Sequence, residues 1–237
     1  MMLDMSGRRS GAFFMHWFEF LSLASEARDR AKQVTATASP GTLPSGEALG
    51  AILFSALATE AFINELPEAA ARDADLPPDV DIPGLQNLAD LAATLDLIEE
   101  AQGQIDLKYQ LASKILTGKT LDPGKAPFQD FANLIKLRND LVHPRHRDRT
   151  RSTGHVEPIS KVVRVLQRRG LTTTRGRQPH DPRGGASWLL EIESSGVANW
   201  AYAAAREIIT ALIEMLPDDW RFTIMDMMRG QIRRAPK

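Results

Sequence analysis

The chain of 237 residues contains no cysteine. This absence excludes disulfide bonds, thiolate metal sites and cysteine nucleophiles, and it fits a reducing compartment, so we expect a cytoplasmic protein. The sequence also lacks an internal repeat, the heptad run of a coiled coil and a glycine-rich phosphate-binding loop. Hydrophobic residues make up 43% and charged residues 25% of the chain, which is ordinary for a soluble globular protein with a substantial core.

No long uncharged apolar run is present near the N-terminus. The stretch "GAFFMHWFEFLSLASEARDRAKQ" contains His16 and Glu19 and becomes charged within two turns. Its apolar part is too short to span a bilayer, so it predicts an amphipathic helix over residues 11–36 and no membrane association. A cleaved signal peptide is the alternative.

Helical patterns follow one another along the rest of the chain. They predict an all-α bundle in a single domain over 1–237, with a core of 11–143 and a C-terminal helix. Ser45 and Ser195 are expected as N-caps, and Pro144 ends the fourth helix because proline disfavours helical geometry in the residue before it. A loop at 117–127 separates the third and fourth helices. After the first, the helices are expected at 44–72, at 85–116 with a break near Gly103, at 127–143, and at 195–216.

The segment "VEPISKVVRVLQRRG" allows two interpretations. Its apolar residues Ile159, Val162, Val163 and Leu166 recur at a helical period, and Gly170 would be the C′ residue of a helix. The β-branched residues also allow a hairpin that pairs 161–166 with 187–193. Whether 160–193 is helical or a hairpin stays open at this point.

Positive charge is concentrated after residue 143. Residues 144–183 contain ten Arg and one Lys against two Asp and one Glu, a formal charge of +8. Because the whole chain carries −1, the remaining residues sum to −9. Such a basic segment could bind a polyanion such as RNA, or it could be a solvated loop without a ligand. In the basic loop segment 144–186, the candidate RNA-binding residues are Arg145, Arg147, Arg175, Arg177 and Arg183.

Two expected helices each place one charge on an apolar face, and the two charges are opposite. In "LIKLRNDLVHPRHRD" (134–148), Arg138 points about 20° from Phe131 round the helix, and in the helix at 44–72 Glu60 points about 20° from Leu49. An isolated charge there would be costly. We therefore predict that Glu60 and Arg138 pair where the helices pack, with Asn64 on the same flank as a supporting residue. Breaking a fully buried pair would cost roughly 3 kcal/mol or more.

The residues around Arg138 suggest chemistry as well as packing. Asn139 and His143 lie four residues apart on one flank of the helix. An arginine holds a phosphate through a fixed fork of donors, and a histidine can move protons near neutral pH. Arg138, Asn139 and His143 could thus bind a phosphodiester and cleave it without a metal or other cofactor. The alternative is that Glu60, Arg138 and Asn139 only lock the helices together.

The stretch "RNDLVH" resembles the motif of the HEPN-domain superfamily: an arginine, a polar residue, a short spacer and a histidine at a helix end. Arg138, Asn139 and His143 match its three positions. The stretch "LATEAFINEL" resembles the helix that carries an acidic residue facing that arginine, and Glu60 matches this position. The likeness covers about a fifth of the chain.

The resemblance implies a HEPN-like helical bundle, here with extra helices and a long basic loop, that forms a homodimer with one composite site. Catalytic members are metal-independent endoribonucleases of toxin–antitoxin and phage-defence systems, which cleave RNA by attack of the ribose 2′-OH. His143 would then assist the attack, Arg138 would stabilise the phosphate, and Asn139 would orient the histidine or the substrate. An antitoxin or another protein is a further expected partner. The alternative function is a non-catalytic dimer that binds a protein or a nucleotide.

Overall fold

The computed structural model describes residues 15–37, 45–74, 85–143, 160–173, 188–215 and 224–236. All regular secondary structure in these ranges is helical, as the sequence predicts. The helices are α1 (His16–Thr37), α2 (Glu47–Ala74), α3 (Leu85–Glu100), α4 (Ile105–Thr117), α5 (Phe128–Val142), α6 (Lys161–Arg168), α7 (Trp188–Ile192), α8 (Ser195–Ile213) and α9 (Ile224–Arg234).

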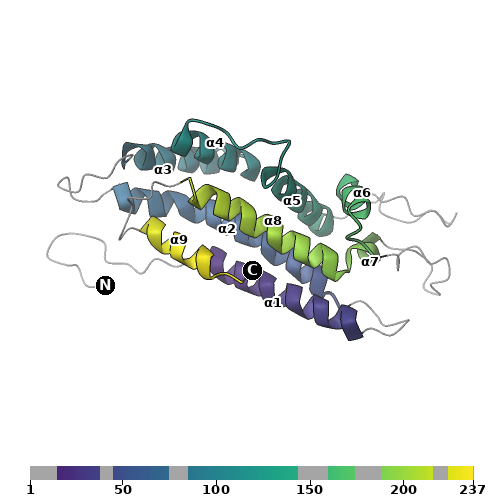
Figure 1. Cartoon of the computed structure of the whole chain (residues 1–237). Helices are drawn as coiled ribbons and strands as arrows, with labels where there is room; N and C mark the ends of the chain where they lie inside the picture. The colour runs from purple at the N-terminus through teal and green to yellow at the C-terminus, as the bar shows by residue number, and fades with distance from the viewer. Residues whose placement is uncertain are drawn as a thin grey trace.

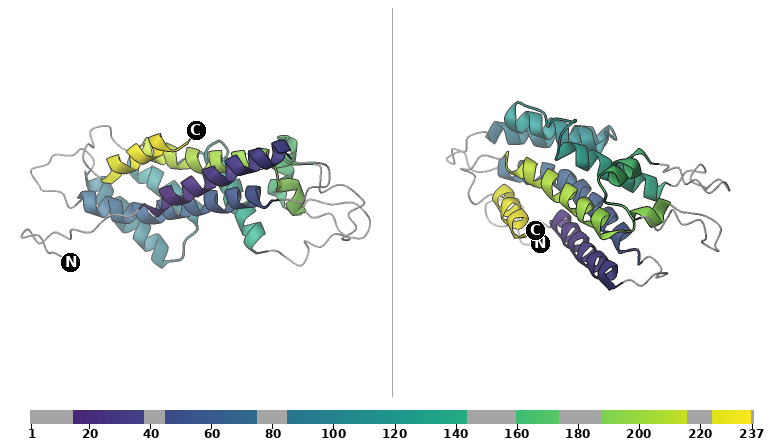
Figure 2. Two further views of the ribbon diagram at one scale, coloured as in Figure 1. Left: turned by 90° about the horizontal axis from the view of Figure 1, so that it is seen from below. Right: turned by 45° about the vertical axis from the view of Figure 1, so that its right-hand side comes forward.

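The helices form three layers around α2 (Figures 1 and 2). The middle layer consists of α2 and α8, which pack along each other. One side is covered by α3, α4 and α5, and the other by α1 and α9. Because α2 contacts α1, α3, α4, α5, α8 and α9, its side chains face every layer, which explains why it is the most apolar of the long helices.

One hydrophobic core contains side chains from every helix in the described ranges. A chain of aromatic rings crosses it: Trp17 of α1 lies edge-on to Phe62 of α2 at 5.5 Å between ring centroids. Phe62 is 6.4 Å from Tyr109 of α4, and Tyr109 is 4.6 Å from Phe131 of α5. The Tyr109 hydroxyl donates a hydrogen bond to the carbonyl oxygen of Thr59 (3.0 Å). This contact fixes α4 and α5 against the part of α2 that carries Glu60.

Several predicted helix boundaries agree with the structure. The expected helix at 85–116 is divided by the turn 101–104 into α3 and α4. The Oγ of Ser45 accepts a long hydrogen bond of 3.4 Å from the Glu47 N–H. The predicted cap Ser195 is wrong, because Ser194 has the extended backbone of an N-cap and its Oγ accepts from the Val197 N–H. The ends predicted at residues 11–14 and at 216 lie outside the described residues.

The hairpin alternative for 160–193 is wrong for the residues that the structure describes. Residues 161–168 form α6 with Ser160 as N-cap, and 188–192 form α7. Gly170 has a φ of +69°. It ends α6 in a Schellman motif, in which the Leu171 N–H donates to the Leu166 carbonyl at 3.0 Å. A left-handed φ is available to glycine without a Cβ clash.

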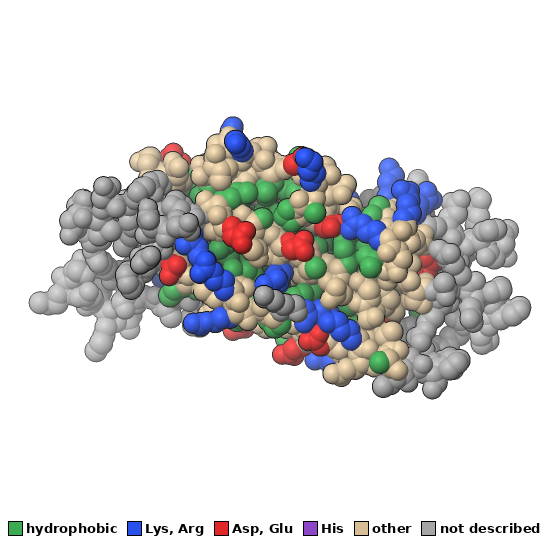
Figure 3. Space-filling model, viewed as in Figure 1, with side chains coloured by type: hydrophobic (Ala, Val, Ile, Leu, Met, Phe, Trp, Pro, Cys, Tyr) green, Lys and Arg blue, Asp and Glu red, His purple; other side chains and the backbone are tan. Residues whose placement is uncertain are grey.

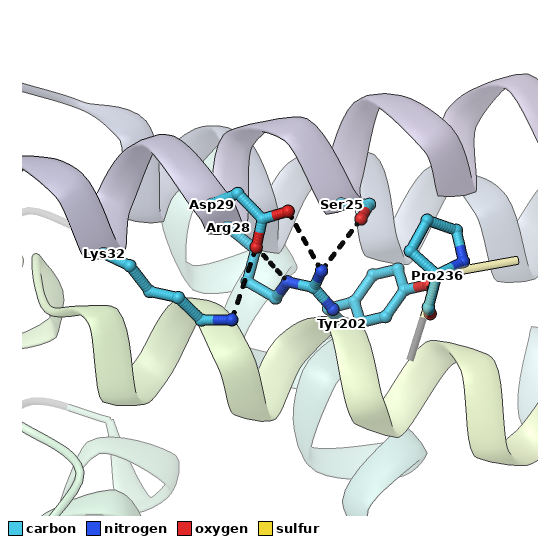
Figure 4. Close-up of polar contacts among 6 residues, drawn as sticks. All are labelled: Ser25, Arg28, Asp29, Lys32, Tyr202 and Pro236. Atoms are coloured by element: carbon cyan, nitrogen blue, oxygen red, sulfur yellow. Dashed lines mark hydrogen bonds and ion pairs between the residues drawn. The ribbon is translucent and has the colours of Figure 1, made fainter.

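The helix α9 was not predicted. Its buried residues Met228, Ile232 and Ala235 have a helical spacing that the sequence analysis did not examine. The end of α9 is anchored close to a buried arginine of α1 (Figure 4). Arg28 is 3% exposed, donates to Asp29 and Ser25, and lies 4.3 Å above the ring of Tyr202. The Tyr202 hydroxyl donates in turn to the Pro236 carbonyl.

By length and composition α2 could cross a membrane. Half of its most apolar window is buried inside the structure, and the central helix of a soluble bundle gives the same pattern. The absence of membrane association and the cytoplasmic location therefore stay predictions.

Candidate functional site

Glu60 of α2 and Arg138 of α5 form an ion pair between Oε1 and Nη2, which confirms the predicted contact. The pair is only partly buried: the Glu60 side chain is 27% exposed and the Arg138 side chain 20%. Arg138 does point in the direction of the buried residues Phe131 and Leu134. It remains accessible because the last turn of α5 extends past the core, where Val142, expected in the apolar stripe, is 51% exposed.

Asn139 holds the second terminal nitrogen of the same guanidinium. Its Oδ1 accepts a hydrogen bond of 2.8 Å from Arg138 Nη1. Asn139 thus orients the arginine, whereas the sequence suggested that it orients the histidine or the substrate. Partial burial lowers the pKa of Arg138 from its ordinary value of 12.5, but a guanidinium starts so high that it keeps its charge at neutral pH. It also has five N–H donors, so donors remain for an anion.

His143 lies at the C-terminal end of α5. It is the C-cap, and its backbone N–H donates to the Asn139 carbonyl oxygen at 2.9 Å. The side chain is exposed and is not among the residues that line the cleft beside Arg138. Within one protomer, the structure therefore brings together Glu60, Arg138 and Asn139, and leaves His143 on the adjoining surface.

A second cation, Lys108 of α4, lies beside this group and was not predicted. Lys108 is 4% exposed, and its Nζ donates to Asn64 Oδ1 at 2.7 Å and to Glu99 Oε2. Asn64, predicted as a supporting residue, thus supports Lys108 rather than Arg138. The spacing of "IDLKYQLA" could have revealed it, because Lys108 falls between Ile105 and Ala112 on the inward face of α4.

Both cations open onto one cleft of about 450 Å³ between α5, the end of α3 and the start of α4. Its floor is provided by Glu60 and Asn64 of α2. The charges that line it are balanced, with three basic and three acidic side chains. These are Arg138, Lys108 and Lys136, and Glu60, Glu99 and Asp106.

The turn between α3 and α4 shapes one wall of the cleft. Gln102 has a φ of +53°, and the Gly103 N–H donates to the Ile98 carbonyl at 2.8 Å, as in a Schellman motif. A Cβ on Gly103 would lie 2.3 Å from Cγ2 of Ile98. A glycine is therefore required for the close approach that turns the chain from Glu99 back toward Lys108.

The candidate RNA-binding residues Arg145, Arg147, Arg175, Arg177 and Arg183 all lie outside the described residues. Part of the expected basic loop is helical: α6 has exposed Lys161, Arg164 and Arg168. Arg169 Nη1 contacts Asp130 Oδ1 of α5 at 2.6 Å. On the face shown in Figure 3, Lys and Arg side chains are interspersed with Asp and Glu side chains. A concentrated basic surface is thus a prediction for the segment 144–183 and not a feature of this face.

Within the ranges that the structure describes, no three His, Asp or Glu side chains come close enough to hold a metal ion. The two cations of the cleft, by contrast, suit an anionic ligand such as a phosphate.

Comparison with known proteins gives no match: no protein-family model, no curated protein and no solved structure is similar to this chain. The HEPN resemblance therefore rests on the residues Glu60, Arg138, Asn139 and His143.

Proposed function

We propose that the protein is a HEPN-like, metal-independent endoribonuclease that cleaves RNA by attack of the ribose 2′-OH on the adjacent phosphate. The observation that carries the proposal is the placement of Arg138. Its guanidinium is held by Glu60 and Asn139 at the rim of a cleft, one turn before the exposed His143 on the same helix. A fixed, charged donor next to a residue able to transfer protons is what phosphodiester cleavage requires.

In the proposed reaction the 2′-oxygen forms a bond to phosphorus and the bond from phosphorus to the 5′-oxygen breaks. The products are a 2′,3′-cyclic phosphate and a 5′-hydroxyl. His143 accepts the proton of the attacking 2′-OH or donates a proton to the leaving 5′-oxygen, and Arg138 stabilises the charge that develops on the phosphate. In a homodimer the two His143 side chains could divide these two roles. DNA, which lacks the 2′-OH, would not be cleaved.

A second candidate function is a non-catalytic binding module for a nucleotide or a protein. It is supported by the charge balance of the cleft, where Glu60 already pairs with Arg138 and Glu99 with Lys108. It is also supported by the exposed position of His143, which does not line the cleft. A role as a toxin or phage-defence effector would follow from the ribonuclease and is proposed with it.

The deciding experiment measures cleavage of a labelled RNA in the presence of a chelator. The wild type should cleave RNA but not DNA of the same sequence, and His143→Ala should be inactive while keeping its helical circular dichroism. Gln129→Ala, an exposed change at the other end of α5, serves as the matched control and should retain activity. Equal cleavage by the wild type and His143→Ala, or none by either, would reject the ribonuclease and favour the binding module.

A further inference from the structure

Lys108 is the most unusual charged residue of the cleft, because it is almost completely buried and yet lines an open cavity. Burying an ammonium group is costly unless hydrogen bonds compensate. Two of its three N–H donors are used, by Asn64 and Glu99. The core already holds α4 through Tyr109 and Thr59, so a second polar link to α2 is not needed for packing alone.

The two contacts of Lys108 differ in character. Asn64 is an uncharged partner from α2 that fixes the ammonium in place. Glu99 lies at the end of α3, and its side chain is 66% exposed, whereas that of Lys108 is 5% exposed. A carboxylate with this much freedom can rotate into solvent, so an anionic ligand could replace it at Lys108 Nζ without moving the backbone.

The two cations of the cleft are also placed at a regular interval. Arg138 contacts Glu60, and Lys108 contacts Asn64, four residues further along α2. Four residues of an α-helix rise about 6 Å, which is comparable to the separation of successive phosphates along a nucleotide strand. Arg138 and Lys108 therefore match two neighbouring phosphates better than two contacts to one phosphate.

We propose that Lys108 forms a second phosphate subsite, which binds the phosphate next to the scissile phosphate held by Arg138, and that Glu99 occupies this subsite when no phosphate is bound. This inference rests on the proposed ribonuclease function and names how its substrate is held. Lys108 then contributes to substrate binding and not to the proton transfers.

The test compares a dinucleotide, which has a single phosphodiester, with an oligoribonucleotide of ten residues. Lys108→Gln should raise KM for the oligonucleotide about tenfold, as expected for loss of one charge-assisted contact, with little change in kcat. It should leave cleavage of the dinucleotide unchanged. Lys114→Gln, an exposed change on the same helix that does not line the cleft, is the matched control. Equal loss on both substrates, or on neither, would overturn the proposal.

Glu99→Gln provides an independent test in case Lys108→Gln does not fold. Removing the competing carboxylate should tighten binding of the oligonucleotide by roughly two- to fivefold, the range of an exposed ion pair. Unchanged or weaker binding would overturn the proposal.

Binding of a 2′-deoxy oligonucleotide, measured by fluorescence anisotropy, separates this subsite from the proposed function. If binding depends on Lys108 but RNA is not cleaved, the ribonuclease fails and the subsite stands. If His143-dependent cleavage occurs while neither binding nor KM depends on Lys108, the subsite fails and the ribonuclease stands.

Discussion

Glu60 of α2 and Arg138 of α5 form an ion pair at the rim of the cleft, where both side chains are partly exposed. This pair is the one long-range contact that the sequence specifies by itself, because each residue is a charge on an apolar helical face. Its partial burial lowers the expected cost of breaking it, since water can solvate a stranded arginine. The first prediction follows from this position.

Changing Glu60 to Gln should lower the free energy of unfolding by about 2 kcal/mol, between the values for exposed and fully buried pairs. Chemical denaturation monitored by circular dichroism measures it. Glu68→Gln is the matched control: it removes another glutamate of α2 that pairs with an arginine, but its side chain is 60% exposed, so its cost should stay below about 0.5 kcal/mol. Equal effects of the two changes would show that the Glu60 pair does not link the helices.

The composite site implied by the resemblance requires a homodimer that contains α5. Val142, next to His143, is an apolar residue with 51% exposure, which an interface would cover. Val142→Glu should weaken dimerisation at least tenfold in analytical ultracentrifugation, because it would place a charge in a desolvated contact. Met227→Glu on α9, also 51% exposed before substitution, should leave the dimer intact. A wild type that stays monomeric at all concentrations would reject the dimer.

The sequence predicts helices and their faces better than it predicts the site. The pairing of Glu60 with Arg138 follows from opposite charges on two apolar stripes, and the end of α6 follows from Gly170. The position of His143 could not be derived, because helical periodicity does not say where α5 leaves the core. The wall of the cleft depends on Gln102 in a left-handed conformation, which its residue type does not favour. Lys108 was detectable, but only by examining α4 as a separate helix.

Stability should depend on pH through Glu65. Its Oε1 accepts from the His16 N–H at 3.0 Å, while its Oε2 is buried without a hydrogen-bond partner in the described part of the chain. Burial raises the pKa of Glu65 from its ordinary value of 4.5, although the contacts with His16 oppose the shift.

A raised pKa means that the folded state binds the proton more tightly than the unfolded state. This contribution to stability is complete below pH 4.5 and is lost as the pH rises through the folded pKa. Glu65→Gln cannot titrate, so it should gain stability relative to the wild type as the pH rises from 4 to 7. Urea denaturation across this range measures the difference. A difference that shrinks toward neutral pH would contradict the prediction.

The last prediction concerns the basic segment 144–183 and the way in which RNA docks. The +8 charge of this segment can contact phosphates without selecting a sequence. Neutralising Arg175, Arg177 and Arg183 together should weaken RNA binding. It should also flatten the dependence of log affinity on log salt by roughly 0.7 per lost contact for a single strand. Fluorescence anisotropy at several salt concentrations measures both effects.

Turnover of bound RNA should survive this triple change, because Arg138 and His143, and not these arginines, are assigned to the chemistry. A control that neutralises Lys119, Lys125 and Arg234, three exposed cations outside the segment, removes the same charge from other surfaces. If both triple variants lose the same salt dependence, net charge alone explains the binding. If binding is intact and turnover is lost only in the segment variant, the segment belongs to the active site. Binding that is absent or insensitive to salt in the wild type would leave the segment as a solvated loop, and the protein would then be better explained as an interaction module.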